Sequence, residues 1–181
     1  QLVWQRDSLL KNFDYKREDF SVPTYYHKNW WGRSTIRDHA LTAGVDSLGG
    51  LFLTACSFEE NVLIEIDYER AEIAVEIGDT VYSTNKKMEA QKNYFLEKGI
   101  IEKSTVPGAW NPVVCVFLNG AENGVIEKIA EHYNKPVKFY FTINGNKISP
   151  KFPLSKRDKK GIKDCYELSV VLKKLMNIRE L

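Results

Sequence analysis

The sequence predicts a single α+β domain in which an antiparallel β-meander is continued by a βαβ unit and helices pack on the sheet. Apolar and charged residues alternate over residues 51–78, and this period of two is typical of β-strands. An apolar run, an amphipathic segment and a second apolar run follow within residues 112–143, in the order of a right-handed βαβ crossover. Residues 161–181 carry apolar side chains at helical spacing, which predicts a last core-facing helix.

The N-terminal part, residues 1–45, is predicted to be helical and aromatic. Residues 2–13 place apolar side chains at near-helical spacing, so we expect a short helix there. Ser34 or Thr35 is a suitable N-cap for a second helix, and Gly44 would end that helix.

The other elements are separated by turn residues. Tight links at Glu59-Glu60 and Glu69-Arg70 predict an antiparallel meander. The predicted elements are strands at 51–58, 61–68 and 71–78, a helix at 83–99, a strand at 112–118, a helix at 121–136, a strand at 137–143 with a hairpin turn at Asn144-Gly145, and the helix from Gly161. The helix, βαβ unit and hairpin together span residues 84–149.

Composition excludes several classes of protein. With 181 residues, of which 43% are hydrophobic and 28% charged, the chain suits one globular domain. Three widely spaced cysteines, Cys56, Cys115 and Cys165, favour packed thiols over a disulfide framework or a zinc site, and hence a cytoplasmic protein. No apolar run has the length of a membrane span, so we expect no membrane partner.

The segment from Val62 to Asp79 predicts a hairpin with an unusual acidic face. If Glu69 and Arg70 form its loop, Asp67 lies directly opposite Glu72. The apolar pairs are then Ile66 with Ile73, Ile64 with Val75, and Val62 with Ile77, while Glu65 faces Ala74 and Glu76 faces Leu63. Like charges directly opposed across two strands are destabilising, so we expect water, a cation, a basic side chain or a bound proton to relieve them.

The order helix, three-stranded meander, helix, strand resembles the core of restriction-endonuclease-like nucleases. The resemblance implies a metal-dependent nuclease that uses Mg²⁺ or Mn²⁺, with Asp67 and Glu72 as metal ligands and catalytic residues. Glu76 is the alternative catalytic acid. The lysine of that family's motif falls on Ala74, or on Gly78 if Glu76 is chosen, so the sequence departs from the motif.

A second resemblance concerns the stretches NWWGRS, IAVEIG and NKKMEAQKNYFLEKG. Together they are similar to an uncharacterised domain appended to some bacterial restriction-type endonucleases, over residues 1–110. This resemblance implies a bacterial or phage defence setting.

Two segments have the composition of a nucleic-acid-binding surface. The stretch from Tyr25 to Arg33 interleaves aromatic and basic side chains, which suits stacking on bases and contact with phosphate. The stretch from Lys151 to Lys163, predicted as a loop that leads into the last helix, is rich in lysine. The candidate nucleic-acid-binding residues are Trp30, Trp31, Arg33, Lys156, Arg157, Lys159 and Lys160. The alternative is that the tryptophans pack on the core and the lysines are only solvated.

Two further features are predicted to be structural. The histidines His27, His39 and His132 have no metal-type spacing, so we interpret each as a surface or hydrogen-bonded histidine. Gly120 and Gly124 precede a helix but match no phosphate-binding motif, which favours a plain connection.

The sequence therefore favours a non-catalytic binding module whose partner is nucleic acid or a protein. The first alternative is the metal-dependent nuclease, and the second is a protein-neutralising or scaffold subunit that docks its acidic face on a basic partner.

Overall fold

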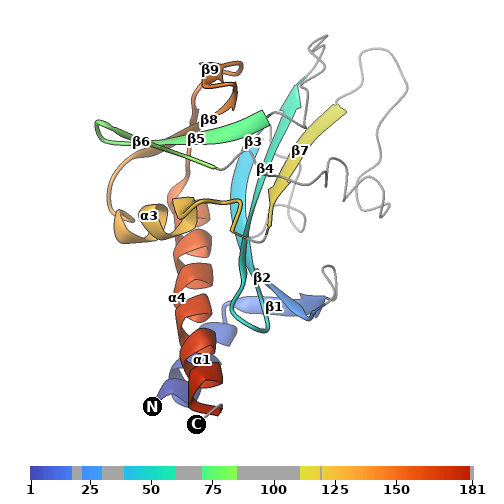
Figure 1. Cartoon of the computed structure of the whole chain (residues 1–181), viewed down its shortest axis with the longest axis vertical. Helices are drawn as coiled ribbons and strands as arrows, with labels where there is room; N and C mark the ends of the chain where they lie inside the picture. Colours follow the sequence, from blue (N-terminus) through green and yellow to red (C-terminus); the bar gives the residue numbers. More distant parts are fainter. Residues whose placement is uncertain (18–21, 30–38, 60–70, 85–110, 119, 180–181) are drawn as a thin grey trace.

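A computed structural model describes residues 1–17, 22–29, 39–59, 71–84, 111–118 and 120–179. These residues form an α+β fold, as predicted, with two antiparallel sheets arranged around one long helix (Figure 1).

The first sheet has the strand order β1-β2-β3-β4-β7, and every neighbouring pair is antiparallel. Its strands are β1 (Phe13–Arg17), β2 (Thr24–His27), β3 (His39–Asp46), β4 (Leu51–Glu59) and β7 (Asn111–Phe117). The strands β4 and β7 lie where the period of two and the apolar run predicted them.

The second sheet has the order β10-β8-β5-β6, and β9 also pairs with β8. Its strands are β5 (Ala71–Ile77), β6 (Thr80–Ser83), β8 (Val137–Ile143), β9 (Asn146–Lys147) and β10 (Phe152–Pro153). The predicted turn between β8 and β9 is confirmed, because Asn144 and Gly145 both have the positive φ that a tight hairpin turn requires.

Three helices are described: α1 (Leu2–Leu10), α3 (Val125–Glu131) and α4 (Lys156–Arg179). The long α4 contacts β3, α3 and α1, and the N- and C-termini lie at the same end of the molecule, where α1 packs beside α4 (Figure 1). Within the first predicted helix, Phe13 is instead the first residue of β1 and is buried.

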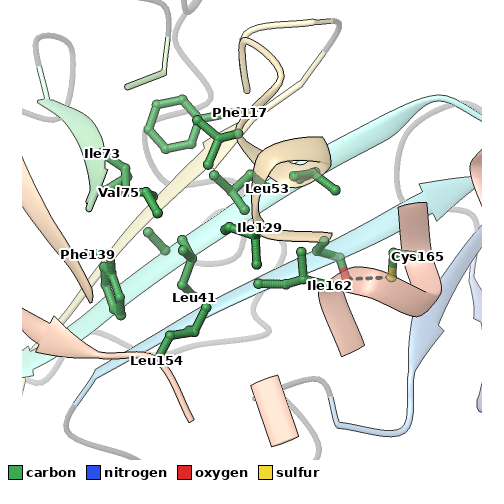
Figure 2. Packing of buried hydrophobic residues seen from close by; sticks show 14 of the residues in the cluster. Leu41, Leu53, Ile73, Val75, Phe117, Ile129, Phe139, Leu154, Ile162 and Cys165 are labelled. Carbon is green, nitrogen blue, oxygen red and sulfur yellow. Dashed lines mark hydrogen bonds between the residues drawn. The ribbon is translucent and has the colours of Figure 1, made fainter. Parts of the chain in front are cut away.

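One hydrophobic core joins both sheets to the helices (Figure 2). The first sheet contributes Leu41 and Leu53, and the second contributes Ile73 and Phe139, all fully buried. Ile162 of α4 lies among them (Figure 2). The strand β5 points Ala71, Ile73, Val75 and Ile77 into this core, which explains the apolar half of its period of two, but Glu72 and Ala74 on its other face are buried as well.

The predicted helix that Gly44 would end is wrong for the residues described. His39–Asp46 is the strand β3, which pairs with β4 from His39 to Val45, with Gly44 opposite Phe52. A Cβ on Gly44 would lie 2.0 Å from Cζ of Phe52, so the Phe52 ring fills the space above the glycine. Gly44 is therefore a packing residue inside a strand. The two predicted caps, Ser34 and Thr35, lie outside the described residues.

The predicted pairing of the acidic hairpin is also wrong at Val75 and Ile77, whereas the pairs Asp67–Glu72 and Ile66–Ile73 each include a residue outside the described part of the chain. Val75 pairs with Phe139 of β8 on one side and with Tyr82 of β6 on the other. Ile77 likewise pairs with β8 and β6, so neither residue has a free edge for residues 62–64. The predicted strand at 61–68 and the predicted helix at 83–99 lie outside the described residues, apart from Ser83 and Thr84.

The strand-helix-strand order at 112–143 is confirmed, but its strands do not form a βαβ unit. β7 pairs with β4 in the first sheet, and β8 pairs with β5 in the second sheet. The helix α3 packs on α4 and carries the chain from one sheet to the other.

The last helix begins earlier than predicted, at Lys156 instead of Gly161. The Ser155 hydroxyl accepts a hydrogen bond from the Asp158 backbone N–H (3.0 Å) and donates one to the Asp158 carboxylate (2.7 Å). This cap at the helix start resembles a capping box, which the sequence signals as Ser-x-x-Asp. The basic residues from Lys156 onwards consequently lie on a helix and not in a loop.

Candidate nucleic-acid interface at the start of α4

The first turns of α4 gather basic side chains on the surface. We define the basic face as Lys156, Arg157, Lys159, Lys160 and Lys163. Lys156, Lys160 and Lys163 have the spacing i, i+4 and i+7 and so lie along one side of the helix. The opposite side carries Asp158, Ile162 and Cys165, which are buried. The amphipathic pattern of α4 therefore directs its lysines to solvent.

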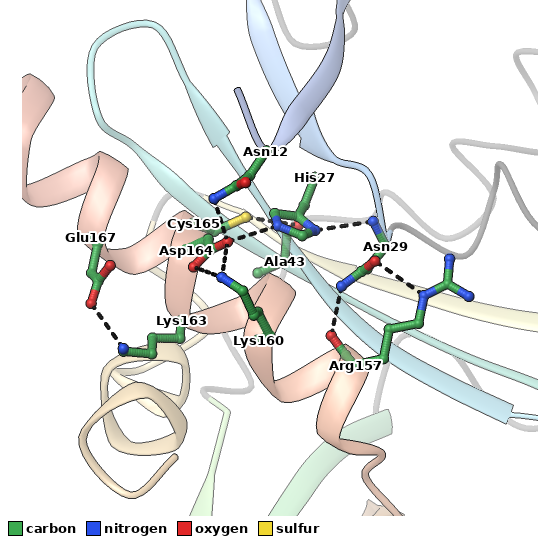
Figure 3. A network of polar contacts seen from close by, with 10 residues as sticks. All are labelled: Asn12, His27, Asn29, Ala43, Arg157, Lys160, Lys163, Asp164, Cys165 and Glu167. Carbon is green, nitrogen blue, oxygen red and sulfur yellow. Dashed lines mark hydrogen bonds and ion pairs between the residues drawn. The ribbon is translucent and has the colours of Figure 1, made fainter. Parts of the chain in front are cut away.

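The chain segment just before Trp30 is attached to this face. The Asn29 side chain makes two hydrogen bonds to Arg157: its amide donates to the Arg157 carbonyl oxygen (2.9 Å), and its oxygen accepts from Nε of Arg157 (3.1 Å). Figure 3 shows these contacts beside those of His27. The residues that join the two segments are 128 positions apart in the sequence, so the tertiary fold alone brings them together.

His27 holds the end of β2 against α4. Its Nδ1 accepts a hydrogen bond from the Asn29 backbone N–H (3.0 Å), which requires an unprotonated Nδ1. Its Nε2 lies 2.9 Å from Oδ2 of Asp164 and therefore donates to that carboxylate. Both ring nitrogens are occupied by protein groups, so His27 in this arrangement has a positioning role and no free lone pair for a metal or a substrate proton.

Asp164 is the centre of the polar network in Figure 3. Its carboxylate accepts hydrogen bonds from Asn12 (2.9 Å), His27 (2.9 Å) and the Lys160 ammonium (2.8 Å). Burial opposes ionisation of Asp164, but the hydrogen bonds from His27 and Lys160 outweigh it and hold the pKa of this carboxyl below its ordinary value. Asp164 thus fixes β2, the turn after α1 and the basic face in one arrangement.

Tyr133, which follows α3, lies against two lysines of the basic face. The Lys163 ammonium is 5.3 Å and the Lys159 ammonium 5.8 Å from the centre of the Tyr133 ring. Lys159 also donates a hydrogen bond to the carbonyl oxygen of Lys135 (2.7 Å), and Lys163 lies 3.3 Å from Glu167. The basic face therefore continues from α4 onto the segment that follows α3.

The predicted nucleic-acid-binding residues fall into two groups. Lys156, Arg157, Lys159 and Lys160 lie together on α4, whereas Trp30, Trp31 and Arg33 lie outside the described residues. The sequence missed the role of two residues at this site, Asn29 and Tyr133. His27 is hydrogen-bonded through both ring nitrogens, which is one of the two alternatives predicted for it. The Lys160–Asp164 pair has the i, i+4 spacing that a helix requires, but nothing in the sequence links residue 27 to residue 164.

The carboxylates of the predicted acidic hairpin have different surroundings. Glu72 is buried and lies opposite Thr142 of β8. Glu76 forms an ion pair with Lys151, lies opposite Lys138, and has a pKa lowered mainly by the hydrogen bond from Lys151. The described half of the hairpin therefore has a face of mixed charge.

The catalytic and metal-binding prediction depends on Asp67, which lies outside the described residues. Among the residues that the structure does describe, no three His, Cys, Asp or Glu side chains are grouped closely enough to hold a metal ion. Glu72 and Glu76 lie on the same face of β5 with Ala74 between them, but Glu76 is already paired with Lys151. This arrangement gives the nuclease hypothesis no further support.

The connection before α3 is stabilised by the protein's own carboxylate. Glu122 is buried, and its Oε2 accepts a hydrogen bond from the Ile126 backbone N–H (3.0 Å). The first backbone N–H groups of a helix have no partner within the helix and can bind an anion. Here the Glu122 carboxylate accepts the hydrogen bond from one of them. The structure thus agrees with a plain connection at Gly120 and Gly124.

All three cysteines are free and buried, as expected for packed thiols. Within the described parts of the chain, no helix is both long and apolar enough to cross a membrane. Comparison of the chain with protein-family models, curated proteins and solved structures finds no match.

Proposed function

We propose that this protein is a non-catalytic module that binds nucleic acid through the phosphate backbone. Its binding surface would combine the basic face of α4 with the aromatic segment that starts after Asn29. The contact between Asn29 and Arg157 is the observation that carries the proposal, because it attaches the start of one candidate segment to the other. Aromatic and basic side chains on one surface are the combination that nucleic-acid binding requires.

The charge of the helix start supports this proposal. Residues 156–167 contain five basic and three acidic side chains. Two of the three acids, Asp158 and Asp164, are buried and point away from solvent, with exposed fractions of 6% and 3%. Asp164 is paired with Lys160, so the net charge of this stretch stays at +2 (five basic minus three acidic side chains), and such a surface attracts phosphate without reading base sequence.

The alternatives have less support from the described residues. An acidic docking face would need unpaired carboxylates, but Glu72 is buried and Glu76 is paired with Lys151. A nuclease would need Asp67 and Glu72 on a common metal. A bacterial or phage defence setting stays a hypothesis that depends on the sequence resemblance alone.

The proposal is tested by the fluorescence anisotropy of labelled single-stranded and duplex DNA of one mixed sequence, in a series of salt concentrations. We expect binding that weakens steeply with salt. Each lost phosphate contact makes the negative slope of log K against log salt shallower by about 0.7 to 0.9. The double variant Lys156→Glu/Lys159→Glu should therefore bind weakly and with a shallower slope.

The matched control is Lys173→Glu/Lys174→Glu, which makes the same change of charge on exposed residues of the same helix, far from its start. This control should bind nearly as well as the wild type. Absence of binding at low salt, or equal loss in the two double variants, would contradict the proposal, since long-range charge alone would then account for the result.

A further inference from the structure

We infer that the preferred ligand of the basic face is a single strand, and that one base of this strand stacks on Tyr133. The inference rests on the proposed function and specifies its ligand. Tyr133 is half-buried and follows α3, and two ammonium groups of the basic face, those of Lys159 and Lys163, lie within 6 Å of its ring centre at 5.8 and 5.3 Å. An aromatic ring between lysines is the arrangement that binds bases and phosphates of one strand together.

The packing of α4 leaves one side of the helix start free for a ligand. The helix packs on β3 and α3, and its inner side is buried. The basic face can therefore follow a phosphate backbone along the surface. Tyr133 lies beside this face, where its ring can take an unpaired base, which a duplex does not offer.

Lys163, beside Tyr133, has a partner that a strand can replace. Lys163 and Glu167 are 3.3 Å apart, and their side chains are 40% and 43% exposed. Exposed pairs of this kind contribute little to stability, so exchanging Glu167 for a phosphate costs little. When Lys163 turns towards a phosphate, the part of the Tyr133 ring that its ammonium covers becomes available to a base.

The helix start itself is unfavourable for a phosphate. The Ser155 hydroxyl accepts the hydrogen bond of the Asp158 backbone N–H, and the Asp158 carboxylate, buried beside it, would repel a second anion. We therefore assign the contacts to the strand to side chains: lysines for the phosphates and Tyr133 for a base.

The decisive experiment compares two labelled oligomers of equal length and charge: a single-stranded oligonucleotide and an abasic deoxyribose-phosphate chain. Each is titrated with the wild type, Tyr133→Leu and Tyr133→Phe, and the fold of every variant is checked by circular dichroism. Tyr133→Leu retains an apolar side chain without a flat π-face, while Tyr133→Phe retains the ring.

We expect Tyr133→Leu to weaken binding of the oligonucleotide by roughly 5- to 150-fold, the loss that follows from one stacked base. Tyr133→Phe should bind within a few-fold of the wild type. The abasic chain should bind the wild type and Tyr133→Leu equally, and the salt slope of the oligonucleotide should be the same for both proteins. The wild type should also bind the single strand more tightly than the duplex.

Two results would overturn the inference while the proposed function stands: Tyr133→Leu binding the oligonucleotide as well as the wild type does, or the duplex binding as tightly as the single strand. If no oligomer binds the wild type at low salt, the proposed function itself fails. If Tyr133→Leu weakens binding of the abasic chain as much as binding of the oligonucleotide, the inference is also overturned. Tyr133 would then position the lysines and would not stack on a base.

Discussion

His27 and Asp164 lie side by side in the interior, with Nε2 of the histidine 2.9 Å from Oδ2 of the aspartate. Only 5% of His27 and 3% of Asp164 is exposed. This contact joins β2 to α4 across 137 positions of the sequence and holds the segment before Trp30 against the basic face. The stability of the fold and the geometry of the candidate interface therefore depend on the same buried pair.

Replacement of Asp164 should destabilise the protein strongly. Asp164→Ala leaves the buried N–H of His27 and the part-buried amide of Asn12 without their acceptor, and a buried donor left unpaired costs about 1–3 kcal/mol. Urea denaturation measures this change. The control is Glu167→Ala, one turn further along α4, where the exposed pair with Lys163 contributes at most about 1 kcal/mol. If the two variants lost equal free energy of unfolding, the buried contacts of Asp164 would be no more stabilising than the exposed pair of Lys163 and Glu167.

Asp164 should also make stability depend on acid pH. Its pKa is lower in the folded protein than the ordinary 3.8, so its contribution is complete above the ordinary value and is lost as the pH falls through the folded value. The free energy of unfolding should therefore fall as the pH drops below the ordinary 3.8, and fall less in Asp164→Asn. Parallel pH curves for the two proteins would show that Asp164 is not responsible.

The ion pair on the second sheet should be visible by NMR. The pKa of Glu76 is lowered mainly by its hydrogen bond from Lys151, and less by the charge of Lys138. Lys151→Met should therefore raise the Glu76 pKa towards its ordinary 4.5, and Lys138→Met should raise it by a smaller amount. Titration of the carboxyl carbon signal measures both shifts, and the reverse order would contradict the pairing.

The Ser155 cap sets where α4 begins and should contribute measurably to the free energy of unfolding. Ser155→Ala removes the acceptor for the Asp158 backbone N–H and should lower the free energy of unfolding by about 1 kcal/mol. Ser155→Thr keeps a hydroxyl at this position and should retain most of the stability. If both variants unfold at the same urea concentration, the hydroxyl has no capping role.

The cysteines should be unreactive until the protein unfolds. Burial raises the pKa of the Cys115 thiol to about 12, and burial together with the negative charge of Asp164 raises that of Cys165. Because thiolates are the reactive form, a disulfide-exchange reagent should modify neither residue at neutral pH without denaturant. Lys174→Cys, on the exposed side of α4, provides the reactive control.

Local patterns in the sequence are sufficient to predict several strands, turns and helices. The period of two at Ala71–Ile77, the apolar run before Phe117 and the Asn144-Gly145 turn each led to the element observed. The stripe along α4 did so as well, but it does not indicate residues 156–160 of the helix, whose start is set by the cap of Ser155 and Asp158. Such patterns are readable because burial of one face of a strand or helix leaves its period in the residues themselves.

Local patterns do not predict which strands pair with one another. The residues 34–44 look like a capped helix that ends in glycine, yet His39–Asp46 is a strand because β4 pairs with it and Phe52 covers Gly44. The partners of β5 are β6 and β8, and β8 lies more than fifty positions away in the sequence. Both outcomes reflect contacts with other strands, which can override local preference.

The candidate interface also has one part that the sequence predicts and another that only the tertiary structure determines. The lysines of α4 are evident in the sequence, as a basic run that predicts a charged surface. Their position beside Asn29 and Tyr133 was decided by tertiary structure, through His27, Asp164 and the packing of α3 on α4. The physical reason is that charge and periodicity belong to single residues and their near neighbours, whereas a binding surface is made by contacts that form only when the whole core is buried.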